Sequence, residues 1–205
     1  MNTTSSTVKD QIPSQVTELV SVISRNMSAE KAAAWQQEIS ALLLSKDLSR
    51  IWSEFACWRL TDREWGMLNY ARTEEERQTI RHIAKLFQEG CTDRHKWSTA
   101  ADWIELGEDD LYAPGDNCTV GYGAYDDLET NHPITSEPIS DDPASCFAAA
   151  AANNCARWAA AGSVAETLRW AAYAEQGKAM GNGKMMRDAA YERMADYLQK
   201  LIQNS

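Results

Sequence analysis

The sequence contains no long apolar run, and it lacks the features of a secreted or membrane-spanning chain. None of its apolar stretches approaches the roughly 18 to 20 residues that a helix needs to cross a bilayer. The first ten residues, MNTTSSTVKD, have neither the basic start nor the apolar run of a signal peptide. The five cysteines are odd in number and scattered, which favours free thiols in a reducing compartment. We therefore expect a cytoplasmic protein without a membrane-spanning segment.

Lysine and arginine are absent from one central stretch of the chain. Residues 97–156 contain twelve acidic residues and no basic residue, whereas the other 145 residues carry 18 acidic and 20 basic residues. This stretch therefore carries a formal charge of −12 and the rest of the chain +2, which together give the formal net charge of −10. A segment of this charge repels nucleic acid and attracts basic proteins. We expect no direct nucleic-acid binding.

Motifs for nucleotides, metals and catalysis are missing as well. Residues 121–126, GYGAYD, lack the third glycine and the preceding strand of a dinucleotide-binding fingerprint, and Met185 stands where a phosphate-binding loop needs Ser or Thr. No stretch has the spacing of a calcium-binding loop. Cys91 and His95 have the spacing of a metal-ligand pair, but no second pair accompanies them. We expect no cofactor, no metal site and no enzymatic activity.

Apolar residues recur at helical spacing over most of the chain, with polar residues that can cap helix ends. Helices are predicted to start near Pro13, Ser28 and Asp47, each with one apolar face. The tryptophans fall on such faces beside aliphatic residues, so we interpret them as core. Capping boxes, in which a hydroxyl and a carboxylate satisfy amides at a helix start, are predicted at Thr61 with Glu64, at Thr73 with Glu76 and at Ser163 with Glu166.

The second half of the chain is rich in alanine. Further helices are predicted over residues 93–106, from Pro143 to Gly162, from there towards Gly177, and after the glycine-broken residues 181–183. Eighteen of residues 143–196 are alanine. Because alanine has a small side chain, we expect these helices to approach one another closely.

The helical pattern stops between residues 107 and 142. Four glycines and three prolines interrupt it, and a short hairpin is compatible with residues 119–125. A connection of this length is uncommon in a compact domain and is usually functional or disordered. The predicted fold is therefore all-α: one domain over residues 1–205, a compact multi-helix bundle with a flexible start at 1–10 and a long acidic loop insertion at 107–142.

This acidic loop carries tyrosines among its carboxylates, a combination that suits a surface for a basic protein. Carboxylates attract such a partner and speed association, and tyrosines supply buried anchors. The alternative is that the acidic residues form a solvated face that only aids solubility. The predicted partner-binding residues are Glu105, Glu108, Asp109, Asp110, Tyr112, Asp116, Tyr122, Tyr125, Asp126, Asp127 and Glu129.

Two blocks of the sequence, residues 80–106 and 143–203, carry a family resemblance. They contain IAKLFQEG from Ile83 and WSTAA from Trp97, followed by FAAAAA from Phe147, CARWAAA from Cys155 and RWAAYA from Arg169. The closing stretch, from Tyr191, reads YERMADYLQKL. These blocks resemble the alanine- and tryptophan-rich immunity proteins of bacteria and phages. The resemblance implies a compact helical protein that neutralises a toxin by binding it, and the acidic loop is an insertion between the two blocks.

The leading hypothesis is a non-enzymatic, immunity-like or phage-encoded inhibitor that binds a basic toxin, nuclease or defence effector through the acidic loop. A structural or adaptor protein with a merely solubilising loop is one alternative. The other is an enzyme whose site is assembled by folding from Cys57, Cys91, His82 or His95.

Overall fold

The computed structural model describes residues 12–101, 143–177 and 183–205, and this part of the chain is an all-α bundle without a β-strand. The predicted fold class is confirmed. The predicted insertion at 107–142 and its hairpin lie outside the described residues, as do residues 1–10. The helices are α1 (Ser14–Arg25), α2 (Ala29–Leu43), α3 (Ile51–Thr61), the 3-10 turn η2 (Met67–Asn69), α4 (Glu74–Gln88), α5 (Arg94–Ala101), α7 (Pro143–Ala160), α8 (Val164–Gly177) and α9 (Gly183–Asn204).

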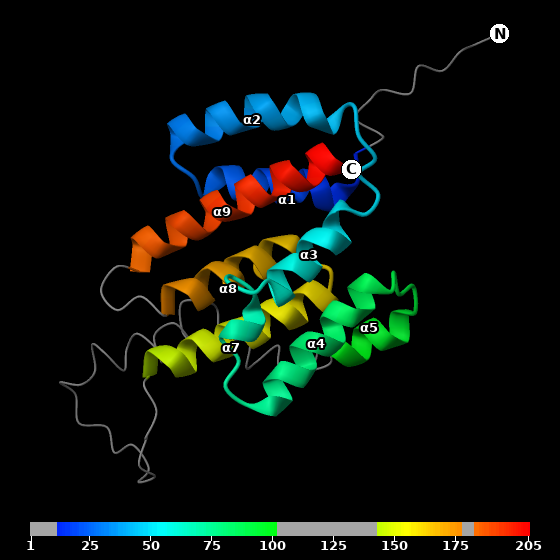
Figure 1. The fold of residues 1–205 in the computed structure, drawn as a ribbon, viewed down its shortest axis with the longest axis vertical. Helices are drawn as coiled ribbons and strands as arrows, with labels where there is room; N and C mark the ends of the chain where they lie inside the picture. The colour runs from blue at the N-terminus through cyan, green and yellow to red at the C-terminus, as the bar shows by residue number, and fades with distance from the viewer. Residues whose placement is uncertain (1–11, 102–142, 178–182) are drawn as a thin grey trace, which may run out of the picture.

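The antiparallel hairpin of α7 and α8 occupies the centre of the molecule (Figure 1). Helices α1, α2 and α9 lie on one side of it, and α4 and α5 lie on the other. Helix α8 packs against α1 and α9, α7 packs against α4 and α5, and α3 contacts both α4 and α9. The hairpin therefore separates two groups of helices: α1 and α2 with the C-terminal helix α9, and α4 with α5, which are consecutive in sequence.

Small residues allow α7 and α8 to pack closely. A Cβ atom on Gly177 would lie 2.7 Å from the Cδ1 atom of Phe147 and 3.2 Å from the backbone nitrogen of Ala148, so only glycine fits at this crossing. The expectation of close approach in the alanine-rich half is correct. The fully or almost fully buried alanines of α7 and α8 are Ala148, Ala149, Ala151, Ala152, Ala156, Ala159, Ala171, Ala172 and Ala174.

The turn between α7 and α8 is a Schellman motif. Gly162 has a φ of 78°, a left-handed conformation that glycine adopts without a steric penalty. The amide of Ser163 donates to the carbonyl of Trp158 at 3.1 Å, which satisfies a carbonyl at the end of α7. Gly90 closes α4 in the same way, with a φ of 60°. Both glycines were predicted as helix ends.

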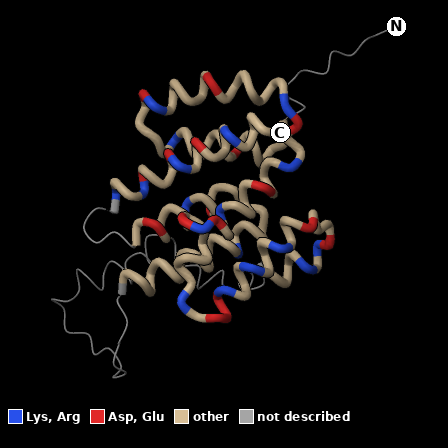
Figure 2. Tube along the Cα trace, viewed as in Figure 1, with Lys and Arg blue, Asp and Glu red and all other residues tan. Residues whose placement is uncertain are grey.

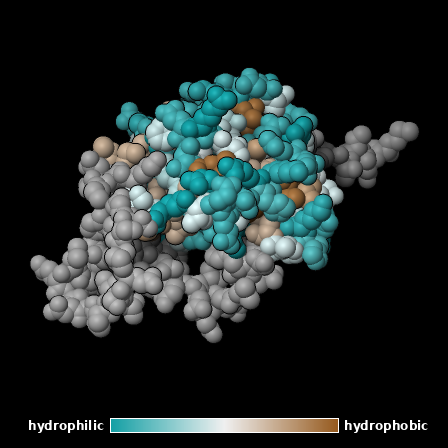
Figure 3. Space-filling model, turned by 60° about the horizontal axis from the view of Figure 1, so that its bottom comes forward, coloured by the Kyte–Doolittle hydropathy of each residue, from teal (hydrophilic) through white to brown (hydrophobic). Residues whose placement is uncertain are grey.

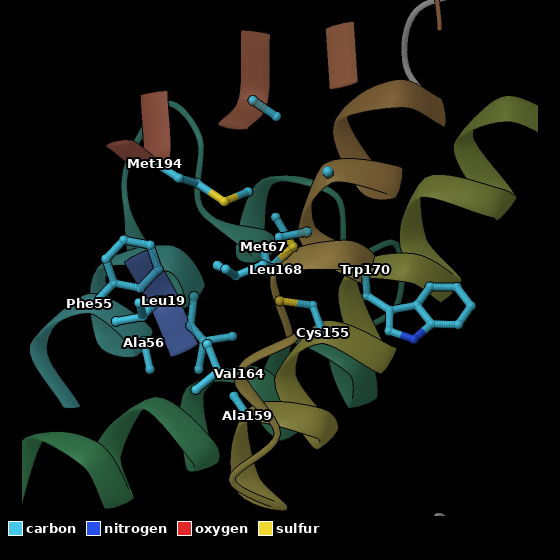
Figure 4. Close-up of a cluster of buried hydrophobic side chains, with 14 of the residues drawn as sticks. Leu19, Phe55, Ala56, Met67, Cys155, Ala159, Val164, Leu168, Trp170 and Met194 are labelled. Atoms are coloured by element: carbon cyan, nitrogen blue, oxygen red, sulfur yellow. The ribbon is translucent and has the colours of Figure 1, made fainter. Parts of the chain in front are cut away.

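One hydrophobic core runs through all layers of the bundle. Figure 4 shows Leu19 of α1, Phe55 of α3 and Met194 of α9 converging with Leu168 of α8 and Cys155 of α7. All five side chains are fully buried. The apolar stripes that predicted the separate helices therefore meet in one core.

The predicted capping box at Thr73 is confirmed. Its hydroxyl accepts from the amide of Glu76 at 3.1 Å, and the Glu76 carboxylate accepts from the amide of Thr73 at 2.9 Å. Ser28 also caps a helix, because its hydroxyl accepts from the amide of Lys31 at the start of α2. These caps lie where a hydroxyl residue immediately precedes a helical stripe.

The cap predicted at Asp47 is wrong. The Asp47 carboxylate accepts from the amide of Ser49 at 2.9 Å and stabilises a turn, whereas α3 begins only at Ile51. The residue before the helix is Arg50, which makes no side-chain cap. A local side-chain bond has therefore replaced the first helical turn.

The capping box predicted at Thr61 is also wrong. Thr61 is the last residue of α3, and its hydroxyl donates to the carbonyl of Cys57 at 2.8 Å. The next residue, Asp62, caps the following turn by accepting from the amides of Glu64 and Trp65 at 3.0 and 2.8 Å. The sequence pattern predicted that the Thr61 hydroxyl would accept from these amides, but the carboxylate of the next residue, Asp62, does so.

The described residues are close to neutral. They carry 18 basic and 17 acidic residues, and Figure 2 shows both signs interspersed along the helices. The face shown in Figure 3 is mostly hydrophilic, with apolar colour confined to small patches. Among the described helices, none has the length and hydropathy to cross a membrane.

Candidate functional site

The predicted partner-binding residues fall in residues 102–142, called the acidic segment below. All eleven of them, from Glu105 to Glu129, lie outside the described residues. The segment contains all twelve acidic residues of the basic-free stretch. The structure therefore describes the body that carries this segment and the surfaces beside its two ends.

Both ends of the acidic segment are attached to helices that pack against each other. The segment follows Ala101, the last residue of α5, and precedes Pro143, the first residue of α7. Helix α5 packs against α7 and α4. The acidic segment is therefore attached to the body at α5 and α7, and we consider the surface formed by α4, α5 and α7.

A groove of about 430 Å³ lies on this surface, between α3, the α4–α5 turn and the end of α7. Aromatic rings form one wall, where Phe87 lies 6.0 Å from Trp52 and 4.8 Å from Trp97, measured between ring centroids. The α7–α8 turn, which includes Ala161 and Gly162, also lines the groove. The lining thus combines large rings with small residues.

Trp97 is held in place by its own polar atom. Its indole Nε1 donates to the carbonyl of Cys91 at 2.9 Å, across the turn that precedes α5. The ring remains partly exposed, and Trp52 does too. The sequence interpretation of the tryptophans as core is therefore incomplete, because these two rings pack on the core and also form the groove wall.

No family model matches this chain. Comparison with curated proteins and with solved structures gives no match either. The resemblance of residues 80–106 and 143–203 to immunity proteins therefore stays a prediction.

A buried network of ion pairs lies at the junction of α3, α8 and α9. The Glu175 carboxylate accepts from Arg59 through one oxygen and from Arg193 through the other. Arg59 also donates to the carbonyls of Trp65 at 2.8 Å and Ala171 at 3.3 Å. The side chains of Arg59 and Glu175 are completely buried, whereas Arg193 is about a quarter exposed.

Burial shifts the pKa values of Arg59 and of two neighbouring side chains, Tyr70 and Cys155. Desolvation lowers the pKa of Arg59 and raises that of Tyr70, and it raises the pKa of Cys155 to about 12. The guanidinium of Arg193 lies 3.8 Å from the centroid of the Trp65 ring, a cation–π contact. The network is closed to solvent over most of its surface, so we assign it a structural role.

The cysteines and histidines considered for an enzyme site do not pair in the described residues. The sulfur of Cys57 lies 3.9 Å from the Thr61 hydroxyl, and that of Cys91 lies 4.0 Å from the carbonyl of Asp93. His95 contacts Thr99 through Nδ1 at 3.4 Å. None of these contacts joins a thiol to an imidazole. Within residues 12–101, 143–177 and 183–205, no group of three or more His, Cys, Asp or Glu residues has the geometry of a metal site.

Two features of the body were missed by sequence reasoning. The groove is formed by residues from three separate parts of the chain, 52–53, 86–97 and 159–162, and Arg59 and Glu175 are 116 positions apart. A buried arginine has no distinct sequence signature, because most arginines are exposed. The only local hint was the placement of Arg59 on α3 between two apolar residues.

Proposed function

We propose that this protein is a non-enzymatic inhibitor that binds and neutralises a basic protein target through its acidic segment, in the manner of an immunity protein or a phage anti-defence protein. The observation that carries the proposal is the division of charge. The acidic segment has twelve acidic residues and no basic residue, whereas the described body has a net charge of +1. The charge is therefore concentrated in one segment, and this segment would attract the target.

The concentration of charge defines the expected binding kinetics. A surface of one sign raises the rate at which an oppositely charged partner arrives, and salt screens this effect over about 8 Å at physiological ionic strength. A body with 18 basic and 17 acidic residues contributes little net attraction. The association rate should therefore depend on the acidic segment and fall as salt is added.

The groove beside α5 supplies the second part of the proposed interface. Interface residues with the largest energetic effect are often aromatic anchors that enter well-packed pockets on the partner surface. The Trp52 and Trp97 rings and the small residues of the α7–α8 turn offer such a pocket, and α5 leads directly into the acidic segment. In this proposal the segment orients the target, and the groove holds an apolar side chain of it.

Charge reversal tests the contribution of the acidic segment. We expect that Asp→Lys substitutions at Asp109, Asp110, Asp126 and Asp127 together will weaken capture of the target from a lysate of the encoding organism at low salt. The control changes the same number of charges on exposed carboxylates of the body. Its residues are Glu18, Glu30, Glu75 and Glu89, each changed to lysine.

The comparison between the two variants decides the result, since both have the same net charge. The expected target is rich in lysine and arginine, is retained by the wild-type protein and the body variant, and is lost from the segment variant and at high salt. Unchanged retention by the segment variant would refute the role of the segment. Self-association of the pure protein with no salt-sensitive partner would favour the structural alternative.

A substitution in the groove tests the anchor without changing charge. Ala161 is exposed and lines the groove, so Ala161→Trp places a bulky ring in it. We expect dissociation of the captured target to become at least tenfold faster, because most interface substitutions act on the dissociation rate. Ala33→Trp, at an exposed position of α2, is the matched control. Equal rates for the two variants would contradict the role of the groove.

A further inference from the structure

A second cavity, of about 330 Å³, lies between α1, α8 and α9, on surfaces that the proposed inhibitor function does not use. Three arginines line it, one from each helix: Arg25 from α1, Arg169 from α8 and Arg187 from α9. Tyr173 and Tyr191 complete its walls. The three helices pack against one another, so the arginines are brought together by the tertiary fold.

The charges in this cavity are only partly compensated. Glu166 is its one acidic lining residue, and this carboxylate pairs with Arg169 at 3.6 Å. Arg25 donates through Nε to the carbonyl of Ser21 at 3.2 Å, which leaves the ends of its guanidinium available. Within the described part of the chain, neither Arg25 nor Arg187 has a carboxylate within salt-bridge distance. The cavity therefore holds a formal charge of +2.

Helix dipoles do not alter this balance. The cavity contains residues from the C-terminal end of α1, where the dipole is negative, and from the N-terminal end of α8, where it is positive. These two contributions oppose each other. The side-chain charges of the arginines therefore determine which ligand is attracted.

We propose that this cavity binds the phosphate group of a small phosphate monoester. A phosphate monoester carries about −1.5 to −2 charges at neutral pH, which matches the excess of two positive charges. Guanidinium groups donate paired hydrogen bonds to phosphate oxygens, and three of them around one cavity can contact several oxygens at once.

The size and walls of the cavity restrict the organic part of the ligand. A volume of about 330 Å³ exceeds what a phosphate ion alone would fill and lies at the lower end of small-molecule sites, which begin near 300 Å³. Tyr191 is 3% exposed, and burial raises its pKa to about 12, so its hydroxyl stays a neutral donor. Tyr173 lies under the guanidinium of Arg169, 5.8 Å from the ring centroid. A small ring or sugar fits beside these side chains.

Titration calorimetry of the full chain with phenyl phosphate tests the proposal. We expect saturable binding at one site per chain, and at least tenfold weaker binding by a variant with Arg25→Gln and Arg187→Gln. The control variant carries Arg63→Gln and Arg81→Gln, which removes the same charge from exposed positions outside the cavity. Thermal melting of both variants verifies that they are folded.

Three outcomes would overturn the proposal. Equal weakening in both variants would mean that net charge, not the cavity, attracts the anion. Binding of phenol as tight as that of phenyl phosphate would show an apolar site without phosphate recognition. Binding of inorganic phosphate as tight as that of phenyl phosphate would show that the cavity does not recognise the organic part of a monoester. None of these results depends on the acidic segment, so they are distinguishable from failure of the inhibitor function.

Discussion

Glu175 should be the carboxylate with the greatest effect on the stability of the described body. Its two oxygens bind Arg59 and Arg193, and its side chain has no exposure to solvent. The substitution Glu175→Gln preserves its shape and removes its charge. Arg59 is then left as a buried cation without a counter-ion, and breaking a buried pair in this way costs about 3 to 5 kcal/mol.

Thermal unfolding followed by circular dichroism measures this effect. For a chain of this size, 1 kcal/mol corresponds to about 2 to 4 °C, so the melting temperature should fall by about 6 to 20 °C. Glu192→Gln is the matched control on α9, because Glu192 pairs with Lys31 at the surface, where 39% and 56% of the two side chains are exposed. An exposed pair of this kind contributes about 0 to 1 kcal/mol.

A double variant tests whether the loss of stability comes from the unpaired charge of Arg59. Replacing both buried partners, with Arg59→Met and Glu175→Leu, removes the uncompensated cation and should recover a large part of the stability. Arg193 retains its contact with the Trp65 ring and its access to water. The reasoning would be refuted if Glu175→Gln and Glu192→Gln lowered the melting temperature equally, or if the double variant were less stable than Glu175→Gln.

Three further predictions concern the hairpin, a cap and alkaline pH. Gly177→Ala should lower the free energy of unfolding, measured in urea, by about 1 to 3 kcal/mol, because the new Cβ atom clashes with Phe147 and Ala148. In the control Gly162→Ala the Cβ atom meets open space, so the cost should be only about 1 kcal/mol of backbone strain. Equal losses in the two variants would contradict the close packing of α7 and α8. Thr73→Ala should destabilise by about 1 kcal/mol in the same assay, with Thr92→Ala, at an exposed loop position, near zero. The free energy of unfolding should fall between about pH 9 and 12, because the Cys155 thiol has a pKa of 9.0 in the unfolded chain and of about 12 in the folded chain. Cys155→Ala should flatten this part of the pH–stability curve. An unchanged slope would exclude the thiol as its cause.

The sequence predicted the elements whose signals are local. Helices α2 and α4 follow directly from Ser28 and Thr73, because each hydroxyl precedes a regular apolar stripe. Gly90 and Gly162 were equally informative, since a left-handed residue at a helix end favours glycine. The pattern failed where two neighbouring residues compete for the same role, as Thr61 and Asp62 do.

The sites of the body could not be predicted in this way. The three arginines of the second cavity are at positions 25, 169 and 187, and nothing in their local sequence indicates that α1 lies against α8 and α9. The sequence pattern predicted Trp97 only as a helical core residue, because its place in the groove depends on residues 159–162, which are distant in sequence. By contrast, the division of charge needed no structure, because it is a property of composition.

The near neutrality of the helical body has a consequence for colloidal behaviour. Without residues 102–142 the remaining chain would carry 20 basic and 18 acidic residues, close to its isoelectric point at neutral pH. Proteins in that state repel one another weakly and tend to precipitate. The charge of residues 102–142 is therefore the main source of long-range repulsion between copies of the molecule, and any partner that neutralised it would reduce the repulsion between complexes.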